Sequence, residues 1–287
     1  MIVAVGEVLI DMLSKDEVTD LCDAHDFETK VGGSCANFVV FCNKQGVKAT
    51  LVATIGADGL GKKILQYLQK EGVCTKQIYT AVKHQTSLIL VGKSKNTPEF
   101  IPYRDADTQI KNIDVDVIKS STILHTTAFA LSRQPAQSVI LNTILLEGMD
   151  KQISIDWNYA LKIWGPDNNA IEVFEKVMST QPLLKISLDD VSRFWATDCT
   201  ADSAKKLLNK YNTMVTCLTC GADGVWFKQY NEAWQFAPSL PANVIDVTGA
   251  GDAFWSGFIV AWFAGNRLAQ CVNNALLIAK KKVEQKI

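Results

Sequence analysis

The sequence predicts an α/β protein in which a mostly parallel central sheet is covered by helices on both faces. Two observations support this fold class. Short β-prone segments alternate with longer helix-like segments along most of the chain, a pattern typical of parallel strands joined by crossover helices. The 287 residues have a hydrophobic content of 48%, enough for a large core. Because no Pro-, Gly- or Ser-rich linker divides the chain, we expect one domain over residues 1–287.

The individual elements follow from apolar periodicity and from the turn residues between apolar runs. Strands are expected at residues 2–5, 50–55, 87–92, 122–126, 152–156, 184–187, 214–219 and 225–228. Helices are expected at residues 35–44, 59–71, 135–147, 169–179, 202–210, 252–264 and 268–282. Residues 11–30 and 80–104 break this rhythm, because they are more polar and alternate without a good helix. We expect them to form a small antiparallel sheet that stands off the main sheet as a lid.

Composition argues against several classes of protein. There are 29 Lys and Arg against 30 Asp and Glu, which gives a net charge of −1. A nucleic-acid or membrane-surface protein would need a basic patch, so we expect neither kind of partner. The longest apolar run, residues 253–264, is too short to span a bilayer. The chain begins with a strand-like segment and has no basic region ahead of an apolar one, so we expect no signal peptide and a cytoplasmic protein.

Other reactive and charged residues are expected to be structural. The eight cysteines show no disulfide framework, and we expect them to be reduced. Cys217 and Cys220 are spaced as C-x-x-C, but residues 213–219 alternate like a strand and no second pair follows. Small hydrophobic side chains are therefore favoured there over a redox or zinc site. The run Lys280-Lys-Lys282 is expected to be a solvated helix end.

The most informative segment is Asp246-Val-Thr-Gly-Ala-Gly-Asp252-Ala-Phe254. It joins a short β-prone run to a long helix-like run, so its glycines should form a tight turn into the helix. The free N–H groups and the dipole at a helix start favour an anion. Asp252 could there accept a proton from a hydroxyl that attacks a phosphoryl group. The alternative interpretation is a glycine-rich turn in which an Asp caps the helix.

Two other glycine motifs precede predicted helices. Gly56-Ala-Asp-Gly-Leu-Gly-Lys-Lys63 nearly matches a P-loop, but Lys63 stands where a hydroxyl would hold Mg²⁺. A turn that opens the following helix is the favoured interpretation. Gly32-Gly33-Ser-Cys-Ala-Asn37 allows close approach to the backbone, and the amide of Asn37 could point at a ligand. On its own this second motif is a weak signal.

Taken together, the motifs resemble the PfkB (ribokinase-like) family of carbohydrate kinases over residues 1–280, and within it a fructokinase. The family's two signatures match Gly32-Gly33-x-x-x-Asn37 and Asp246-x-Thr-Gly-Ala-Gly-Asp252-x-Phe254. Further elements match Gly6-Glu7-x-x-x-Asp11, Gly56-x-Asp58, Asp156-x-Asn158 and Thr219-x-Gly221-x-x-Gly224. The resemblance implies a three-layer sandwich with a β lid.

The resemblance also implies a reaction: transfer of the γ-phosphoryl group of ATP to a hydroxymethyl group of a neutral sugar, for which we expect fructose. Asp252 is then the base, and the amides of Gly249, Ala250 and Gly251 form an anion hole. The implied sugar ligands are Asp11, Gly32, Gly33, Asn37 and Asn158. Arg104, on the segment that returns from the lid, is a further candidate contact, and an Arg on the surface is the alternative interpretation. The implied nucleotide ligands are Lys185, Ser187, Thr219, Gly221, Gly224 and Asn274.

The resemblance implies two kinds of cation as well, and the predicted lid raises the question of a second protein copy. Mg²⁺ would bridge the phosphates mostly through water, with Asp190 nearby. Asp246 and Thr248 would be ligands of a monovalent cation such as K⁺ beside the anion hole. Exposed strand edges of the lid favour pairing of two chains into a homodimer.

The sequence departs from the family pattern at two places. Ala160 follows Asp156-x-Asn158 where related fructokinases and ketodeoxygluconate kinases often have Arg, and its absence disfavours a sugar-acid substrate. Ser187-x-x-Asp190 replaces the family's N-x-x-E element, which predicts altered Mg²⁺ geometry and allows reduced activity. The alternatives are a ribokinase, a ketodeoxygluconate kinase, a nucleoside kinase, or an inactive sugar-binding protein on the same fold. A dehydrogenase fold is disfavoured, because no G-x-G-x-x-G follows the first strand.

Overall fold

The computed structural model describes residues 1–94, 99–148 and 150–287. In this part of the chain the main sheet has nine strands in the order β13-β12-β11-β10-β9-β8-β1-β4-β5. The strands from β5 to β11 are parallel, and β12 and β13 are antiparallel to their neighbours. Their bounds are β1 (Ile2–Val5), β4 (Ala49–Gly56), β5 (Ile78–Ala81), β8 (Ile123–Thr127), β9 (Gln152–Asp156), β10 (Leu183–Ser187), β11 (Val215–Thr219), β12 (Gly224–Gln229) and β13 (Gln235–Pro238). The predicted fold class is confirmed.

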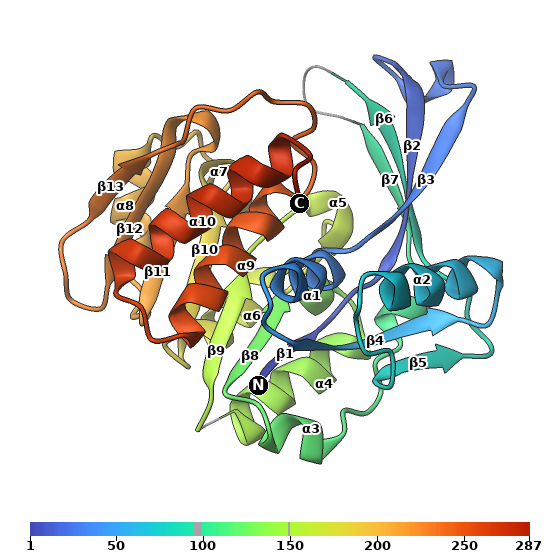
Figure 1. Cartoon of the computed structure of the whole chain (residues 1–287), viewed down its shortest axis with the longest axis horizontal. Helices are drawn as coiled ribbons and strands as arrows, with labels where there is room; N and C mark the ends of the chain where they lie inside the picture. The colour runs from blue at the N-terminus through green and yellow to red at the C-terminus, as the bar shows by residue number, and fades with distance from the viewer. Residues whose placement is uncertain (95–98, 149) are drawn as a thin grey trace.

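Helices cover both faces of this sheet (Figure 1). One face carries α1 (Ser34–Lys44), α2 (Gly59–Lys70), α9 (Ala250–Phe263) and α10 (Leu268–Val283). The other carries α3 (Val115–Lys119), α4 (Ala136–Asn142), α5 (Leu161–Trp164), α6 (Ala170–Met178), α7 (Leu188–Phe194) and α8 (Ala201–Leu208). Along β1, Ile2 and Ala4 pack on the first set and Val3 and Val5 on the second. This alternation follows from the two-residue period of a strand, and it makes a strand buried on both faces uniformly apolar.

A second, smaller sheet stands off the first at the upper right of Figure 1. Its strands are β2 (Leu9–Glu17), β3 (Phe27–Gly32), β6 (Leu88–Lys93) and β7 (Phe100–Tyr103), in the order β3-β2-β6-β7. The sheet was predicted to be antiparallel, and this is wrong for its central pair, because β2 and β6 are parallel. Strand β2 follows β1 of the main sheet, and β6 follows β5. Because β1 and β5 run in the same direction, β2 and β6 both leave the main sheet from the same edge.

Other local predictions differ in detail. The helix expected at residues 135–147 is α4 followed by a π-helical turn over Thr143–Glu147. The short edge strands β5 and β13 and the helix α7 were not predicted. The near P-loop is a structural turn, since Asp58 caps α2 by accepting a hydrogen bond from the Gly61 N–H (2.8 Å). Cys217 is buried and unpaired in β11. None of the described helices is long and apolar enough to cross a membrane.

Candidate active site

The residues predicted to carry the chemistry gather at the carboxyl edge of the main sheet. The parallel strands β1, β8, β9, β10 and β11 end there, and α9 begins there. Ligands of open α/β sheets bind outside this edge. Two cavities lie at it, one of about 300 Å³ and one of about 740 Å³. Asp252 lines the smaller cavity, and the two residues before it, Ala250 and Gly251, line the larger. The start of α9 therefore lies between the two cavities.

Asp252 is held at the start of α9 by two side chains from α1. Its Oδ1 accepts a hydrogen bond from Ser34 Oγ (2.6 Å), and its Oδ2 accepts one from Asn37 Nδ2 (2.8 Å). Burial raises the pKa of Asp252 to about 6, helped by the negative charge of Asp156 and opposed by these two hydrogen bonds. A carboxylate with such a pKa is ionised at neutral pH and can accept a proton from a hydroxyl.

Glu7, for which we predicted no role, fixes the start of α1. Its Oε1 accepts hydrogen bonds from the backbone N–H groups of Ser34 (2.8 Å) and Cys35 (3.3 Å), and its Oε2 accepts one from Thr127 Oγ1 (2.8 Å). Burial raises the pKa of Glu7 to about 7. The carboxylate thus satisfies free N–H groups of the first helical turn, which carries Ser34. The signal in the sequence was an acidic residue directly after a buried strand.

The smaller cavity contains most of the predicted sugar ligands. These are Asp11, Gly33, Asn37 and Asn158, joined by Glu7, Thr248 and Gly249. Leu9 and Asp11 of β2, Ile89 of β6 and Phe100 of β7 place the small sheet against this cavity. Gly32 is not one of the lining residues. A Cβ atom on it would collide with the carboxylate of Asp11, so this glycine makes room for a site residue.

The charge of the smaller cavity is negative. Its ionisable lining residues, among those that the structure describes, are the carboxylic acids Glu7, Asp11 and Asp252. Burial, with the charge of Asp252, raises the pKa of Asp11 to about 6. Ala160, at the position where the family resemblance led us to expect an Arg, also lines this cavity.

Arg104 is not placed as we predicted. Its side chain is buried, and it donates hydrogen bonds to Asp107 (3.0 Å from Nε to Oδ2) and to Ser132 Oγ (2.5 Å). Its guanidinium group stacks on the ring of Phe129, 4.0 Å from the centroid. Phe129 lines the smaller cavity and Arg104 does not. The arginine therefore supports Phe129 in the cavity wall, because its guanidinium group is already paired with the buried side chains of Asp107 and Ser132.

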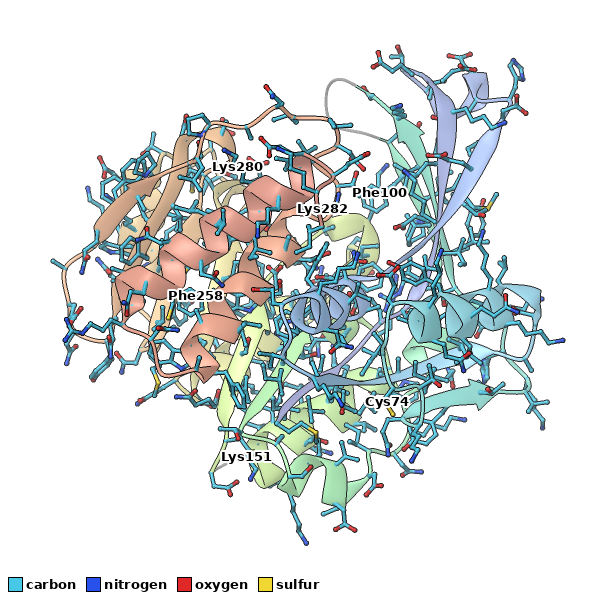
Figure 2. The ribbon with its side chains drawn as sticks, in the orientation of Figure 1. Cys74, Phe100, Lys151, Phe258, Lys280 and Lys282 are labelled. Carbon is cyan, nitrogen blue, oxygen red and sulfur yellow. The ribbon has the colours of Figure 1, made fainter. Side chains whose placement is uncertain are left out.

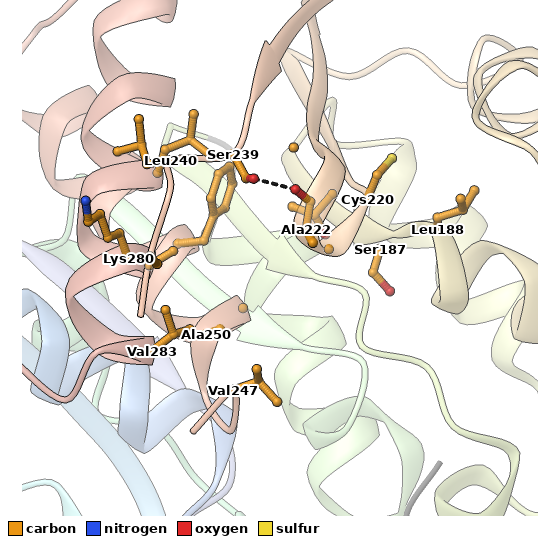
Figure 3. A pocket seen from close by; sticks show the side chains of 18 of the residues that line it. Ser187, Leu188, Cys220, Ala222, Ser239, Leu240, Val247, Ala250, Lys280 and Val283 are labelled. Carbon is orange, nitrogen blue, oxygen red and sulfur yellow. Dashed lines mark hydrogen bonds between the residues drawn. The ribbon is translucent and has the colours of Figure 1, made fainter. Parts of the chain in front are cut away.

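The larger cavity contains the predicted nucleotide ligands. Figure 3 shows it bounded by the end of β10, the turn after β11, residues 239–247 and the last turns of α10. The predicted residues that line it are Lys185, Ser187, Asp190, Thr219, Gly221 and Gly224. Asn274 is an exception. Its Nδ2 donates to the Gly257 carbonyl (2.7 Å), so it ties α10 to α9 away from the cavity.

A buried ion pair lies under the turn that joins the two cavities. Lys185 Nζ lies 2.8 Å from both carboxylate oxygens of Asp156, and the two side chains are 6% and 3% exposed. Burial would lower the pKa of Lys185, but the charges of Asp156 and other carboxylates hold it above its ordinary value. A Cβ atom on Gly251 would lie 3.0 Å from Lys185 Nζ. The ammonium group is thus packed directly beneath the backbone of the predicted anion hole.

The turn before α9 offers fewer free amides than the predicted anion hole of Gly249, Ala250 and Gly251. Gly249 has φ 75°, in the left-handed region that favours glycine. The Ala250 N–H donates to the Val247 carbonyl (3.0 Å), so it is already used within the turn. The amides of Gly251 and Asp252 belong to the first helical turn, which has no intrahelical partners for its N–H groups.

Asp190 fits Mg²⁺ only through water. Its Oδ2 accepts hydrogen bonds from the N–H (3.3 Å) and the Oγ (2.5 Å) of Ser187, and its Oδ1 accepts one from Arg193 (3.1 Å). Burial raises the pKa of Asp190 to about 6. Among the described residues no three His, Cys, Asp or Glu side chains form a cluster that could hold a metal. Mg²⁺ commonly keeps several waters and takes its remaining ligands from phosphates.

A monovalent cation fits poorly at the predicted place. Asp246 Oδ1 accepts a hydrogen bond from the Thr248 N–H (2.9 Å), and Asp246 Oδ2 lies 3.9 Å from Lys282 Nζ. The carboxylate therefore already has a cationic neighbour. Thr248 lines the smaller cavity, whereas Asp246 lines neither.

The chain is similar to known sugar kinases in sequence and in structure. Residues 1–286 match the model of the pfkB family of carbohydrate kinases. The chain is 33% identical over 288 residues to the ATP-dependent 6-phosphofructokinase of Thermoanaerobacterium thermosaccharolyticum, over 98% of this chain and 87% of that protein. The structure of Halothermothrix orenii fructokinase matches with a TM-score of 0.85 and 29% identity, over 96% of this chain and 98% of that one. A Pyrococcus horikoshii sugar kinase in complex with ATP matches with a TM-score of 0.83 and 26% identity, over 99% and 92% of the two chains.

Proposed function

Because the chain belongs to the pfkB family of carbohydrate kinases and is a sugar kinase, we propose that it transfers the γ-phosphoryl group of ATP to a hydroxymethyl group of fructose. One observation carries this proposal. Asp252 lines a cavity that carries several polar side chains, and the two residues before it, Ala250 and Gly251, line a second cavity of about 740 Å³, a volume typical of small-molecule sites. A base between these cavities can reach a hydroxyl in one space and face a phosphoryl group in the other.

In the proposed reaction the sugar hydroxyl gives its proton to a carboxylate oxygen of Asp252 as it attacks the phosphoryl group. Bound Mg²⁺ would neutralise charge on the β- and γ-phosphates, with Asp190 near it through water. Lys185 places a buried positive charge beneath Gly251, on the side of the nucleotide cavity. The amides of Gly251 and Asp252 point from the helix start toward developing negative charge.

The lining of the smaller cavity supports a neutral sugar. A phosphorylated sugar would meet Glu7, Asp11 and Asp252 with no Lys or Arg among the described lining residues. A sugar acid would lack the Arg that binds a carboxylate in related kinases, because Ala160 stands in its place. The similarity to a 6-phosphofructokinase makes fructose 6-phosphate the second candidate substrate, and the acidic lining favours fructose over it.

The small sheet is proposed to act as a lid over the sugar. Its strands contribute Leu9, Asp11, Ile89 and Phe100 to the cavity wall. Closure of such a sheet would exclude water and limit hydrolysis of ATP. In the described part of the chain β3 and β7 are its outer strands. Exposed strand edges favour pairing with another chain, so we expect a homodimer formed through this sheet.

The test is an ADP-release assay with ATP and Mg²⁺ on fructose, fructose 6-phosphate, ribose, glucose, ketodeoxygluconate and adenosine. We expect the highest kcat/KM on fructose and loss of turnover with Asp252→Asn. A higher kcat/KM on fructose 6-phosphate would replace fructose as the substrate and leave the kinase assignment intact. No turnover on any acceptor, with a sugar still raising the melting temperature, would leave a sugar-binding protein on a kinase fold.

A further inference from the structure

Lys282 provides a positive charge at the place where the family resemblance implies a bound monovalent cation. We propose that the ammonium group of Lys282 serves as a built-in cation beside the turn at residues 246–249, so that the protein works without K⁺. This inference rests on the proposed kinase function, since that turn opens the helix that carries Asp252. The residue lies at the end of α10 that faces the small sheet (Figure 2).

The geometry places Lys282 between Asp246 and Gly249. Its Nζ is 3.9 Å from Asp246 Oδ2, and the two side chains are 18% and 30% exposed. Its Cε lies 3.7 Å from the position of a Cβ atom on Gly249. The other oxygen of Asp246 accepts the Thr248 N–H at 2.9 Å. One carboxylate oxygen is therefore held by the turn itself, and the other faces the ammonium group of Lys282 as an ion pair longer than a hydrogen bond.

The backbone holds Lys282 in this place. The carbonyl of Val283, the next residue of α10, accepts hydrogen bonds from the N–H groups of Ile245 (2.8 Å) and Asp246 (3.3 Å). Glu284 Oε1 accepts another from the Asn243 N–H (3.1 Å). The segment before the turn is thus tied to the end of α10.

The charges around Asp246 favour one cation, the ammonium group of Lys282, and disfavour an additional K⁺ ion. Asp246 accepts a hydrogen bond from the Thr248 N–H, and the ammonium group of Lys282 lies 3.9 Å from its other carboxylate oxygen. The carboxylate is therefore already compensated at neutral pH. A K⁺ ion placed beside Asp246 would lie near an ammonium group, and like charges at such distances repel strongly. The residues present therefore do not fit the monovalent-cation site that the family resemblance implies.

Lys282 would act through the turn. It is not among the residues that line either cavity, so it is a positioning residue. By neutralising Asp246 and packing against Gly249, it fixes the turn that sets the direction of the first amides of α9. If the ammonium group of Lys282 takes the place of a bound cation, K⁺ should restore the activity of a variant that lacks this group. The loss of a side chain with a purely structural role would not be restored by K⁺.

The first experiment compares phosphoryl transfer to fructose in KCl and in tetramethylammonium chloride at equal ionic strength. Wild-type protein is expected to show the same rate in both salts. Lys282→Met should lose about tenfold in tetramethylammonium chloride, a typical effect of removing a positioning group, and should recover when K⁺ or NH₄⁺ is added. Lys282→Arg, which keeps the charge, should stay independent of K⁺. Lys281→Met, on the exposed side of the same helix, is the matched control and should behave as wild type.

The second readout is independent of activity. K⁺ should raise the unfolding temperature of Lys282→Met above that in tetramethylammonium chloride and should not do so for wild type. Saturable activation or K⁺-specific stabilisation of wild type would overturn the inference, and so would a loss in Lys282→Met that no cation restores. The wild-type comparison decides the question even where the variant fails to fold. If wild type transfers phosphate to no sugar in either salt, the proposed function fails, and the unfolding measurement still tests the role of Lys282.

Discussion

Asn37 Nδ2 donates a hydrogen bond to Asp252 Oδ2 across 2.8 Å and so joins the first turns of two helices whose residues are 215 positions apart. Ser34 Oγ holds the other oxygen of the same carboxylate. The proposed base is therefore oriented before any substrate arrives. A sugar hydroxyl that binds Asp252 has to share a carboxylate oxygen with Ser34 or Asn37, or displace one of these donors. The hydrogen bonds of both donors should therefore change when substrate binds.

Replacing Asp252 with Asn should remove the base and keep its shape. An amide can still accept from Asn37 and donate to Ser34, but it cannot accept a proton at neutral pH. We expect kcat to fall by about 10²- to 10⁴-fold, the usual contribution of general base catalysis. The unfolding temperature at pH 8 should stay equal or rise, because burial penalises the charge that is removed. A variant that keeps more than a tenth of wild-type kcat would contradict the role of Asp252.

The pH dependence should report the ionisation of the same group. The base is active as the carboxylate, and burial raises its pKa to about 6. As pH falls through this value the carboxylate is protonated, so kcat/KM should decline below about pH 6. Asp11 has a similarly raised pKa of about 6 and interacts with Asp252, so the two should titrate as a pair. Because the charge of Asp252 raises the pKa of Asp11, the two protons should bind in separate steps, and we expect the decline of kcat/KM to be broader than that of a single group.

Asn37→Ala should move the acid limb of the pH profile, the range in which kcat/KM declines, to higher pH. Its hydrogen bond stabilises the ionised form of Asp252, and its loss disfavours ionisation. The control is Asn43→Ala on the same helix. Asn43 bonds to the backbone of Gly72 and Ala49 far from the cavities, so its loss should lower stability without moving the acid limb. A limb that stays in place in Asn37→Ala would show that another group controls it.

The sequence predicts the parts of the site that depend on local pattern. The glycine turn, the start of α9 and the candidate base Asp252 follow from residues adjacent in the chain. The order of strands and helices follows from periodicity, because most strands are buried on both faces. The edge strands β5 and β13 escape prediction, since four residues at a sheet edge carry too little apolar pattern.

What the sequence does not predict is the direction of polar side chains. Arg104 and Asn274 have the residue types of ligands, but the fold gives each a nearer buried partner. Glu7 was passed over because its role depends on the N–H groups of a helix 27 residues away. Lys282 was expected in a solvated helix end, and only the packing of α10 against residues 243–246 turns it toward Asp246.

Lys185→Met should destabilise the protein strongly, because it leaves Asp156 buried without its cation. Breaking such a pair costs about 3–5 kcal/mol of unfolding free energy. The double variant Lys185→Met with Asp156→Asn should recover most of this loss and remain inactive, since the charge beneath Gly251 is still absent. Urea unfolding of the wild type, both single variants and the double variant gives the coupling energy. Additive effects would mean that the two groups do not act as a pair.

Gly249→Ala tests the conformation of the turn. Gly249 has φ 75°, and the space for a Cβ atom is open to 3.7 Å, so the cost comes from the backbone alone. An L-residue in this region costs about 1–2 kcal/mol. Gly265→Ala is a matched control, with φ 80° and nothing within 4 Å. Both variants should lose similar stability in urea, and only Gly249→Ala should lower kcat for phosphoryl transfer. Equal activities would exclude a role for the turn in the reaction.

Ala160→Arg should widen the choice of substrate toward sugar acids. Ala160 lines the smaller cavity, the proposed sugar site, and an Arg there could bind a carboxylate with two parallel hydrogen bonds. Hydrogen bonds to charged groups contribute about 1.5–3 kcal/mol, so kcat/KM on ketodeoxygluconate should rise by about 10- to 100-fold relative to fructose, at about 1.4 kcal/mol per factor of ten. Leu161→Arg is the control, because its side chain is 54% exposed and lies outside the cavity lining. Equal changes on both substrates would place residue 160 away from the sugar. A gain confined to the acid would show that the missing arginine, and not the shape of the cavity, excludes it.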